Sequence, residues 1–237
     1  MMKRTLLTLC TAAALYGCTA FAQHNTTSKT IETGHLRGVA AHSGFDVTLK
    51  QGPSSSAVIS IDSRLQPYLR ATVSDGVLSL GFDNLPTAIQ RQNLSRKAEV
   101  TVNTLEKLNV NSGAYVHGTG NFTADECEVE VHSGAQVNEI NIVAKEVEVS
   151  VHSGARAVLR GSADKLEASA ASGASADLTG LQAKEVQAGA SSGSTLGCWA
   201  TNSIKGRASS GANIRYKGNP AHTDNSSSSG GSVRPAK

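Results

Sequence analysis

Apolar and polar residues alternate strictly along much of the second half of the chain. From Cys127 to Val131, and again from Val147 to Val151, every second residue is apolar and the residues between are polar. The same alternation recurs from Leu166 to Ala170 and from Val186 to Ala190. A period of two is typical of a β-strand that buries one face and exposes the other. The pattern therefore predicts a series of short, half-buried strands.

Each of these strands leads into the same three-residue phrase, Ser-Gly-Ala, with one Ser-Gly-Ser variant. The phrase starts at Ser112, Ser133, Ser153, Ser172, Ser192 and Ser210, at steps of 21, 20, 19, 20 and 18 residues. A nearly constant period is typical of a solenoid, in which each repeat forms one rung. Alternation resumes after the phrase, so a rung is predicted to be two short strands hinged at Ser-Gly, plus a third short segment. Glycine suits the hinge because it adopts positive φ without a Cβ clash.

Stacked in register, such rungs form parallel strands about 4.8 Å apart, with equivalent residues in columns. The coil is expected to be right-handed. An α-helical repeat is the alternative, and the period of two and the Gly and Ser in every repeat disfavour it. The repeated serines are expected to form hydroxyl ladders that satisfy backbone groups of the turns, rather than to act as nucleophiles. The predicted fold is an all-β, parallel β-helix-like solenoid of about six rungs over residues 105–220.

Residues 23–104 are predicted to form an irregular, antiparallel, β-rich cap. Asp75-Gly76 is a strong hairpin signal between two predicted strands. His42-Ser43-Gly44 echoes the repeat, so an irregular start of the stack is the alternative. We favour the cap because the hairpin breaks the rung period and solenoids need protected ends. Residues 221–237 are Ser- and Gly-rich and are predicted to be a flexible tail, with a brief return of residues 232–234 to the last rung as the alternative.

The first 22 residues predict a secretory signal peptide. Lys3 and Arg4 precede a short apolar run, and Ala20-Phe21-Ala22 is a small-x-small cleavage site. The run is too short to span a membrane comfortably. The alternative is lipid attachment at Cys18, which the poorly fitting Tyr16 disfavours. We therefore expect an exported protein, in the periplasm, on the outer-membrane surface or secreted, without a transmembrane segment.

Cleavage after Ala22 changes the charge and the cysteine content. The chain has 22 basic and 19 acidic residues and a net charge of +3, and cleavage removes two bases and no acid, which leaves +1. With no basic patch interleaved with aromatic residues, nucleic acid is not an expected partner. Cys127 and Cys198 remain, and they lie too many rungs apart for a disulfide, so two buried free thiols are expected.

The repeats resemble those of the GIN-domain family, labelled putative auto-transporter adhesin heads. The strand 45–49 (Phe-Asp-Val-Thr-Leu), the hairpin 75–80 (Asp-Gly-Val-Leu-Ser-Leu) and the ending 216–220 (Tyr-Lys-Gly-Asn-Pro) fit the family too. The resemblance covers roughly residues 31–220. It implies an all-β, β-helix-like protein exported by Bacteroidetes-type bacteria and no established activity or functional residue. Ser194 departs from the repeat, as does the interruption at residues 197–199.

His132 and His152 are the most suggestive candidate ligands. They occupy the same repeat position on neighbouring rungs, so their rings are expected to stack about 5 Å apart on the exposed face. With Glu130 they are a candidate Zn²⁺ site. We favour instead a solvated face on which repeat duplication copied one histidine, and no metal or cofactor is predicted. The same interpretation is preferred for the Glu128, Glu130 and Glu148 ladder, which lacks the turn signature of calcium-binding β-rolls.

Tyr115 and Trp199 are candidate sugar-stacking side chains if they are exposed. No Gly-x-Ser-x-Gly motif is present, and no histidine is placed as a base with a carboxylate behind it. The acids outside the glutamate ladder, such as Asp164 and Asp177, are scattered along the repeat.

These observations favour a non-enzymatic, exported adhesin or envelope-associated binding or scaffold protein. The expected partner is a surface or envelope ligand, a glycan or a protein, and the sequence favours no oligomeric state. A carbohydrate-active β-helix enzyme, a polysaccharide lyase or hydrolase, is the alternative. Such an enzyme needs clustered carboxylates, or carboxylates with Lys or Arg, on one face. A scaffold component without a ligand is a third interpretation.

Overall fold

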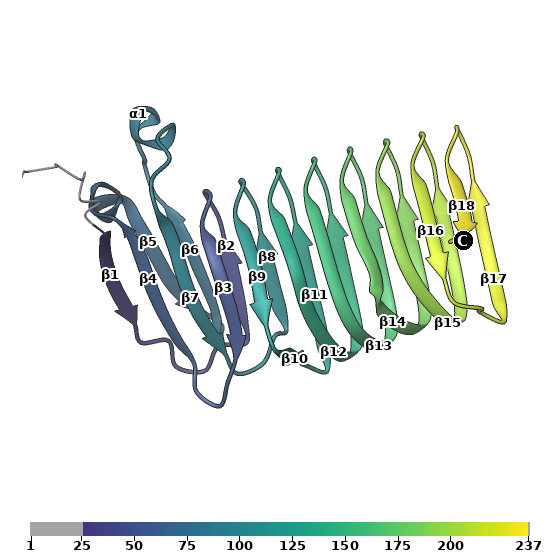
Figure 1. The fold of residues 1–237 in the computed structure, drawn as a ribbon, viewed down its shortest axis with the longest axis horizontal. Coiled ribbons are helices and arrows are strands. Elements are labelled where there is room, and N and C mark those ends of the chain that lie inside the picture. The colour runs from purple at the N-terminus through teal and green to yellow at the C-terminus, as the bar shows by residue number, and fades with distance from the viewer. Residues whose placement is uncertain (1–25, 237) are drawn as a thin grey trace, which may run out of the picture.

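The computed structural model describes residues 26–236 and confirms an all-β solenoid (Figure 1). The predicted signal peptide and Cys18 lie outside the described residues. The N-terminal part contains β1 (Thr26–Ile31), β2 (Gly38–Ala41), β3 (Asp46–Gln51), β4 (Ser56–Asp62), the 3-10 helix η1 (Ser63–Tyr68), β5 (Leu69–Ser74), β6 (Val77–Phe82), α1 (Thr87–Gln90) and β7 (Arg96–Val102). Among residues 26–236, no helix has the length and apolar character needed to cross a membrane.

The stack itself consists of parallel strands. It contains β8 (Lys107–Val110), β9 (Tyr115–Thr119), β10 (Asn121–Thr123), β11 (Glu126–Val131), β12 (Gln136–Val151), β13 (Arg156–Ala170), β14 (Ser175–Ala190), β15 (Thr195–Ala208), β16 (Asn213–Lys217), β17 (His222–Ser227) and β18 (Ser232–Pro235). The long strands β12 to β15 each leave one hinge, turn along the base of the stack and rise to the next hinge (Figure 1). Each rung therefore contributes to two faces, which we call the pre-hinge face (β2, β8, β11, the second halves of β12 to β15, and β17) and the post-hinge face (β3, β9, the first halves of β12 to β15, β16 and β18).

The hinges form one continuous column. Ser153 and Gly154 have φ values of 56° and 69°, and the Ala155 N–H donates to the His152 carbonyl, which closes the turn. Each hinge glycine N–H then donates to the backbone carbonyl of the hinge serine on the next rung. These bonds are Gly44 to Ser112, Gly113 to Ser133, Gly134 to Ser153, Gly154 to Ser172, Gly173 to Ser192, Gly193 to Ser210 and Gly211 to Ser229, at 3.0–3.2 Å. The ladder is thus built from main-chain carbonyls and not from the predicted serine hydroxyls.

The core lies between the two faces, and its side chains next to the hinges become smaller towards the C-terminal rungs. Two residues before the hinge, the buried side chain is Val131 or Val151 in the early rungs and Ala170, Ala190 or Ala208 in the later ones. Because each rung is too narrow to bury its own apolar face, the core depends on contacts between neighbouring rungs. Ser194, which replaces alanine after its hinge, is buried and donates its hydroxyl to the Ala170 carbonyl at 2.8 Å.

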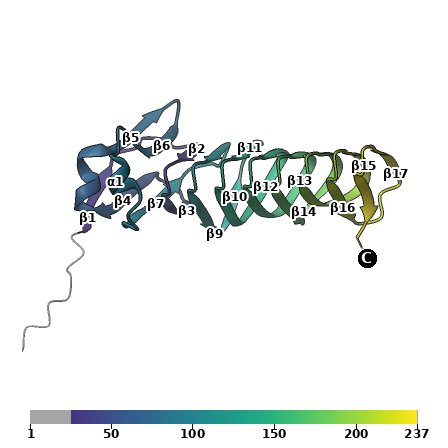
Figure 2. The same ribbon diagram turned by 90° about the horizontal axis from the view of Figure 1, so that it is seen from above.

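The predicted boundary between cap and solenoid is wrong. β2 and β3 flank a hinge at Ser43-Gly44 and pair in parallel with β8 and β9, so the first rung lies inside residues 23–104. Two hairpin-like excursions separate this rung from the second in sequence, which hides the repeat period. The antiparallel strands β1, β4 and β5 form the actual cap, gathered at the N-terminal end with η1 and α1 (Figure 2).

The predicted flexible tail is also wrong, because residues 222–235 form a further rung. β17 and β18 pair in parallel with β15 and β16, around a hinge at Ser229-Gly230 with φ values of 47° and 77°. The Asn225 side-chain oxygen accepts a hydrogen bond from the Gly206 N–H at 3.1 Å. Strand pairing uses backbone groups, so a Ser- and Gly-rich segment at the end of a preformed stack pairs without an apolar face of its own.

Candidate binding surface

In-register stacking pairs opposite charges between neighbouring rungs. Lys145 lies 2.8 Å from Asp125 and Lys184 lies 2.7 Å from Asp164, and Lys165 pairs with Glu146 in the same way. Adjacent strands hold these side chains close enough to interact, and opposite charges at such positions stabilise a sheet. Each pair is exposed to solvent and therefore contributes little by itself. The common arrangement on this solenoid is nevertheless a cation stacked on an anion.

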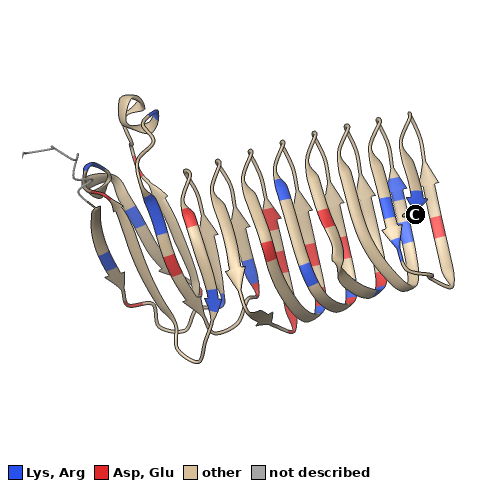
Figure 3. Cartoon of the chain, viewed as in Figure 1, with Lys and Arg blue, Asp and Glu red and all other residues tan. Residues whose placement is uncertain are grey.

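The pre-hinge face departs from this arrangement on its middle rungs. Glu128, Glu148 and Glu167 are register partners on three successive strands, and Glu126 and Glu146 are partners on two of them. Figure 3 shows these acids in red on the middle rungs and basic residues in blue on the C-terminal rungs. Like charges directly opposite one another are destabilising, so this face carries an excess of negative charge that Lys107 and Lys165 compensate only in part.

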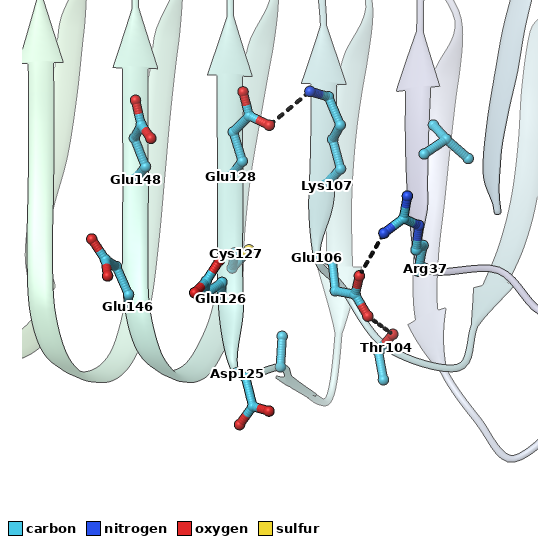
Figure 4. Close-up of a pocket in the computed structure, with 12 residues that line it drawn as sticks. Arg37, Thr104, Glu106, Lys107, Asp125, Glu126, Cys127, Glu128, Glu146 and Glu148 are labelled. Carbon is cyan, nitrogen blue, oxygen red and sulfur yellow. Dashed lines mark hydrogen bonds and ion pairs between the residues drawn. The ribbon is translucent and has the colours of Figure 1, made fainter. Parts of the chain in front are cut away.

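The acids line a groove of about 810 Å³ at the N-terminal side of this column (Figure 4). Its walls and floor are formed by Arg37, Val77, Thr104, Glu106, Lys107, Ala124, Asp125, Glu126, Cys127, Glu128, Glu146 and Glu148. Arg37 pairs with Glu106 at 3.2 Å and Lys107 with Glu128 at 2.7 Å. Among the described residues, Glu126 and Glu148 have neither a hydrogen bond nor an ion pair. The groove therefore offers two carboxylates without an ion pair beside four paired ones, because Asp125 and Glu146 pair with Lys145 and Lys165.

Electrostatics and burial within the groove favour a charged Lys107 ammonium and a neutral Cys127 thiol. The hydrogen bond that the Lys107 ammonium donates to Glu128 raises the pKa of Lys107, which keeps this ammonium charged. Burial, with smaller contributions from Glu106 and Glu128, raises the pKa of Cys127 to about 12. A thiol needs to ionise to act as a nucleophile. Cys127 is therefore an apolar part of the groove floor, and the groove is suited to binding cations and hydrogen-bond donors.

The structure confirms that His132 and His152 stack but does not add Glu130 to them. The ring centroids are 5.3 Å apart and the planes differ by 6°. The Glu130 carboxylate instead accepts a hydrogen bond from Asn109 at 2.5 Å. In parallel stacked rings the nitrogen lone pairs point side by side rather than at one point. Across residues 26–236, no group of three or more His, Cys, Asp or Glu side chains is arranged to hold a metal ion.

The two aromatic candidates lie on the post-hinge face but on different rungs. Tyr115 follows the hinge at residue 112 and Trp199 the hinge at residue 192, so four rung spacings, about 19 Å, separate them. The Lys217 ammonium lies 3.9 Å from the centroid of the Trp199 ring, and the Tyr115 ring lies against His117. These contacts occupy one face of the Trp199 indole and leave the two rings without a common stacking platform.

Sequence reasoning missed a third arrangement, in which His117 lies between a hydroxyl and a carboxylate. Its Nε2 is 3.2 Å from the Thr48 hydroxyl, and its Nδ1 is 3.9 Å from Asp46 Oδ1. Both Nδ1 and Oδ1 are buried without a hydrogen-bond partner. Thr48 and Asp46 lie on β3 and His117 on β9, and the strand register that joins them was hidden by the intervening hairpins. The longer distance exceeds a hydrogen bond, so this geometry forms no proton relay.

Comparisons with known proteins agree with the fold. The model of the family described as "Putative auto-transporter adhesin, head GIN domain" matches residues 35–220. A putative adhesin from Bacteroides fragilis superposes with a TM-score of 0.78 at 19% identity, covering 89% of this chain and 97% of its own. A putative lipid binding protein from Parabacteroides distasonis has a TM-score of 0.70 at 15% identity, covering 91% and 98%. A putative adhesin from Parabacteroides merdae has a TM-score of 0.64 at 18% identity, covering 90% and 96%. No curated protein matches the chain.

Proposed function

The chain belongs to the GIN-domain family of putative auto-transporter adhesin heads, and from this premise we propose that it is an exported, non-enzymatic binding protein. Its binding surface in this proposal is the acid-lined groove on the pre-hinge face. The observation that carries the proposal is the column of like-charged glutamates, which breaks the opposite-charge stacking seen elsewhere. A bound partner that supplies positive charge relieves this repulsion.

The preferred partner in this proposal is a cationic or donor-rich segment of a protein or polymer. Glu126 and Glu148 are free to accept hydrogen bonds, while Arg37 and Lys107 hold the neighbouring carboxylates in place. Hydrogen bonds to charged groups are the stronger kind. The groove is rigid because its rungs β8, β11 and β12 are each paired with a neighbour on both sides. A rigid groove binds without the ordering cost that a mobile loop incurs.

A lysine-rich peptide tests this proposal. We expect it to bind the wild-type protein at low salt and more weakly as salt rises, since the contact is electrostatic. Replacing the free carboxylates, Glu126→Gln with Glu148→Gln, is expected to weaken binding about tenfold. The control, Glu32→Gln with Glu185→Gln, removes the same charge outside the groove. Equal affinity of the two double variants would refute the groove as the binding surface.

A carbohydrate-active enzyme is the second candidate, and one observation favours it. The sequence suggested that the acids outside the glutamate ladder are scattered, whereas the groove gathers ladder and other carboxylates with Lys107 and Arg37. Glycosidases act through paired carboxylates. Incubating the protein with envelope polysaccharides and measuring the release of reducing ends separates the two functions. Release that is lost in the Glu126→Gln, Glu148→Gln variant supports the enzyme and contradicts the non-enzymatic proposal, while glycan binding without release supports a binding protein.

A further inference from the structure

The C-terminal rungs carry a second break in the charge pattern, of the opposite sign. Arg215 on β16 and Arg234 on β18 are direct register partners, and both are exposed on the post-hinge face. Strand spacing brings their backbones to about 4.8 Å from each other. Within the part of the chain that the structure describes, neither guanidinium has a hydrogen bond or an ion pair. Two like charges at paired positions repel, so the bare protein leaves this column uncompensated.

The surroundings of the two arginines supply no counter-charge. The next position down the column is Gly197, which has no side chain, and below it is Asp177. Asp177 is two rung spacings, about 10 Å, from Arg215. Its Oδ1 already accepts hydrogen bonds from the Thr179 N–H and hydroxyl, at 3.2 and 2.7 Å. The closest acid in the column is therefore both distant and occupied.

A third cation lies beside the pair. Lys217 is two residues after Arg215 on the same strand and faces the same side, and Trp199 on the neighbouring rung packs against its ammonium at 3.9 Å. A cation held over an indole ring is attracted by the ring and loses part of its freedom to move away. Arg215, Arg234 and Lys217 thus place three positive groups on two neighbouring rungs, and we call these three residues the arginine corner.

We propose that the arginine corner binds a tetrahedral oxyanion, a phosphate or sulfate group carried on a larger molecule. Guanidinium groups bind such oxyanions with paired N–H donors in a planar fork, and two of them in register present such forks to one anion. Binding replaces the repulsion between Arg215 and Arg234 with two attractions. The site lies on the opposite face and at the opposite end of the stack from the acidic groove, so it is independent of the proposed function.

Calorimetric titration with inorganic phosphate, inorganic sulfate and tripolyphosphate tests this site. We expect tripolyphosphate to bind most tightly, since it offers several oxyanions, and its affinity to fall with salt. The double variant Arg215→Gln, Arg234→Gln is expected to bind about tenfold more weakly or worse. The variant Arg215→Lys, Arg234→Lys keeps the charge and loses the planar fork of N–H donors. Its affinity for tripolyphosphate is expected to lie between those of the wild type and the glutamine double variant. Comparing phosphate with sulfate shows which group the site prefers.

Arg156→Gln is the matched control. Arg156 lies on the same face, and its register partners Gln136 and Ser175 are uncharged. We expect this variant to bind like the wild type. Without anion, the glutamine double variant is expected to melt no lower than the wild type, because it removes a repulsion. Wild-type protein that binds none of the three anions, or an Arg156→Gln variant weakened as much as the double variant, overturns the proposal.

Discussion

The imidazole rings of His132 and His152 lie face to face on neighbouring rungs, with centroids 5.3 Å apart and planes 6° apart. The in-register stack causes this contact, because both residues precede a hinge serine by one position. The contact makes it costly to charge both rings. Burial, and then the proximity of His132, lowers the pKa of His152 below its ordinary value of 6.5.

This lowered pKa predicts a loss of stability in mild acid. The unfolded His152 takes up a proton at about its ordinary pKa, whereas the folded one takes it up only at lower pH, so the unfolded state binds more protons in between. The stability that neutral His152 contributes is therefore fully present above pH 6.5. It falls as the pH drops towards the pKa of His152 in the folded protein. Denaturant unfolding at pH 7.5 and pH 5 measures it. We expect the wild type to lose more free energy of unfolding between these pH values than His152→Gln does.

His222→Gln is the control for this comparison, since His222 is exposed on β17 and has no stacked histidine. It is expected to show the wild-type pH dependence. An identical pH dependence in His152→Gln and wild type contradicts the prediction.

The glycines of the stack fall into two classes, which predicts two sizes of effect. A Cβ at Gly154 in the hinge meets no atom within 4 Å, so Gly154→Ala incurs only the strain of positive φ, about 1–2 kcal/mol. A Cβ at Gly161, where φ is 115°, overlaps the Ile142 backbone carbonyl on the neighbouring rung. Gly161→Ala is therefore expected to lose about 3 kcal/mol or more. Thermal and urea unfolding measure both, and equal losses would refute the assigned register.

The last rung predicts that the C-terminal segment contributes to stability. Deleting residues 221–237 exposes the edges of β15 and β16. It also removes Val233, a partly buried side chain that packs against the core. We expect a lower melting temperature and some aggregation, as for any exposed sheet edge. Asn225→Ala, which removes the acceptor of the Gly206 N–H, is expected to lose about 1 kcal/mol. A truncated protein as stable as the full chain would show that the segment is a tail after all.

Both described cysteines are free and buried, as the sequence predicted. Burial is the largest cause that raises the pKa of each thiol to about 12. We expect Cys127 and Cys198 to resist alkylation in the folded protein at pH 8 and to react quickly in denaturant. Mass spectrometry after a timed iodoacetamide pulse counts the modified sites. Rapid labelling of either residue under native conditions is the contrary outcome.

The rungs were predictable because apolar and polar residues alternate strictly and the alternation is interrupted by a repeated hinge. Few folds other than a stack of short strands are compatible with this pattern. Val131 and Val151 occupy equivalent positions in the sequence and adjacent positions in the sheet, so local pattern and tertiary register coincide. The first and last rungs were missed for different reasons. The Asp75-Gly76 hairpin separates the hinge at Ser43 from the next one, and the polar β17 lacks the apolar alternation by which strands are recognised.

The stacked histidines were predictable for the same reason, since they share one repeat position. The groove was not, because one wall contains Arg37, which belongs to the first rung that the hairpins hide in the sequence. The contact between His117 and Thr48 likewise depends on how β3 returns to pair with β9. Sequence periodicity specifies neighbours within the repeat, whereas the cap and its junction depend on contacts between segments far apart in the chain.

Both charged columns rest on the register of the hinges, and cysteine cross-linking measures that register directly. Ser153→Cys with Ser172→Cys places two thiols on adjacent hinges, where backbones about 4.8 Å apart suit a disulfide. Ser153→Cys with Ser210→Cys separates them by three rungs, about 14 Å. The assigned register predicts rapid, complete disulfide formation in the first pair under mild oxidation and none within the monomer in the second. Equal cross-linking of the two pairs, or none in the first, would contradict it.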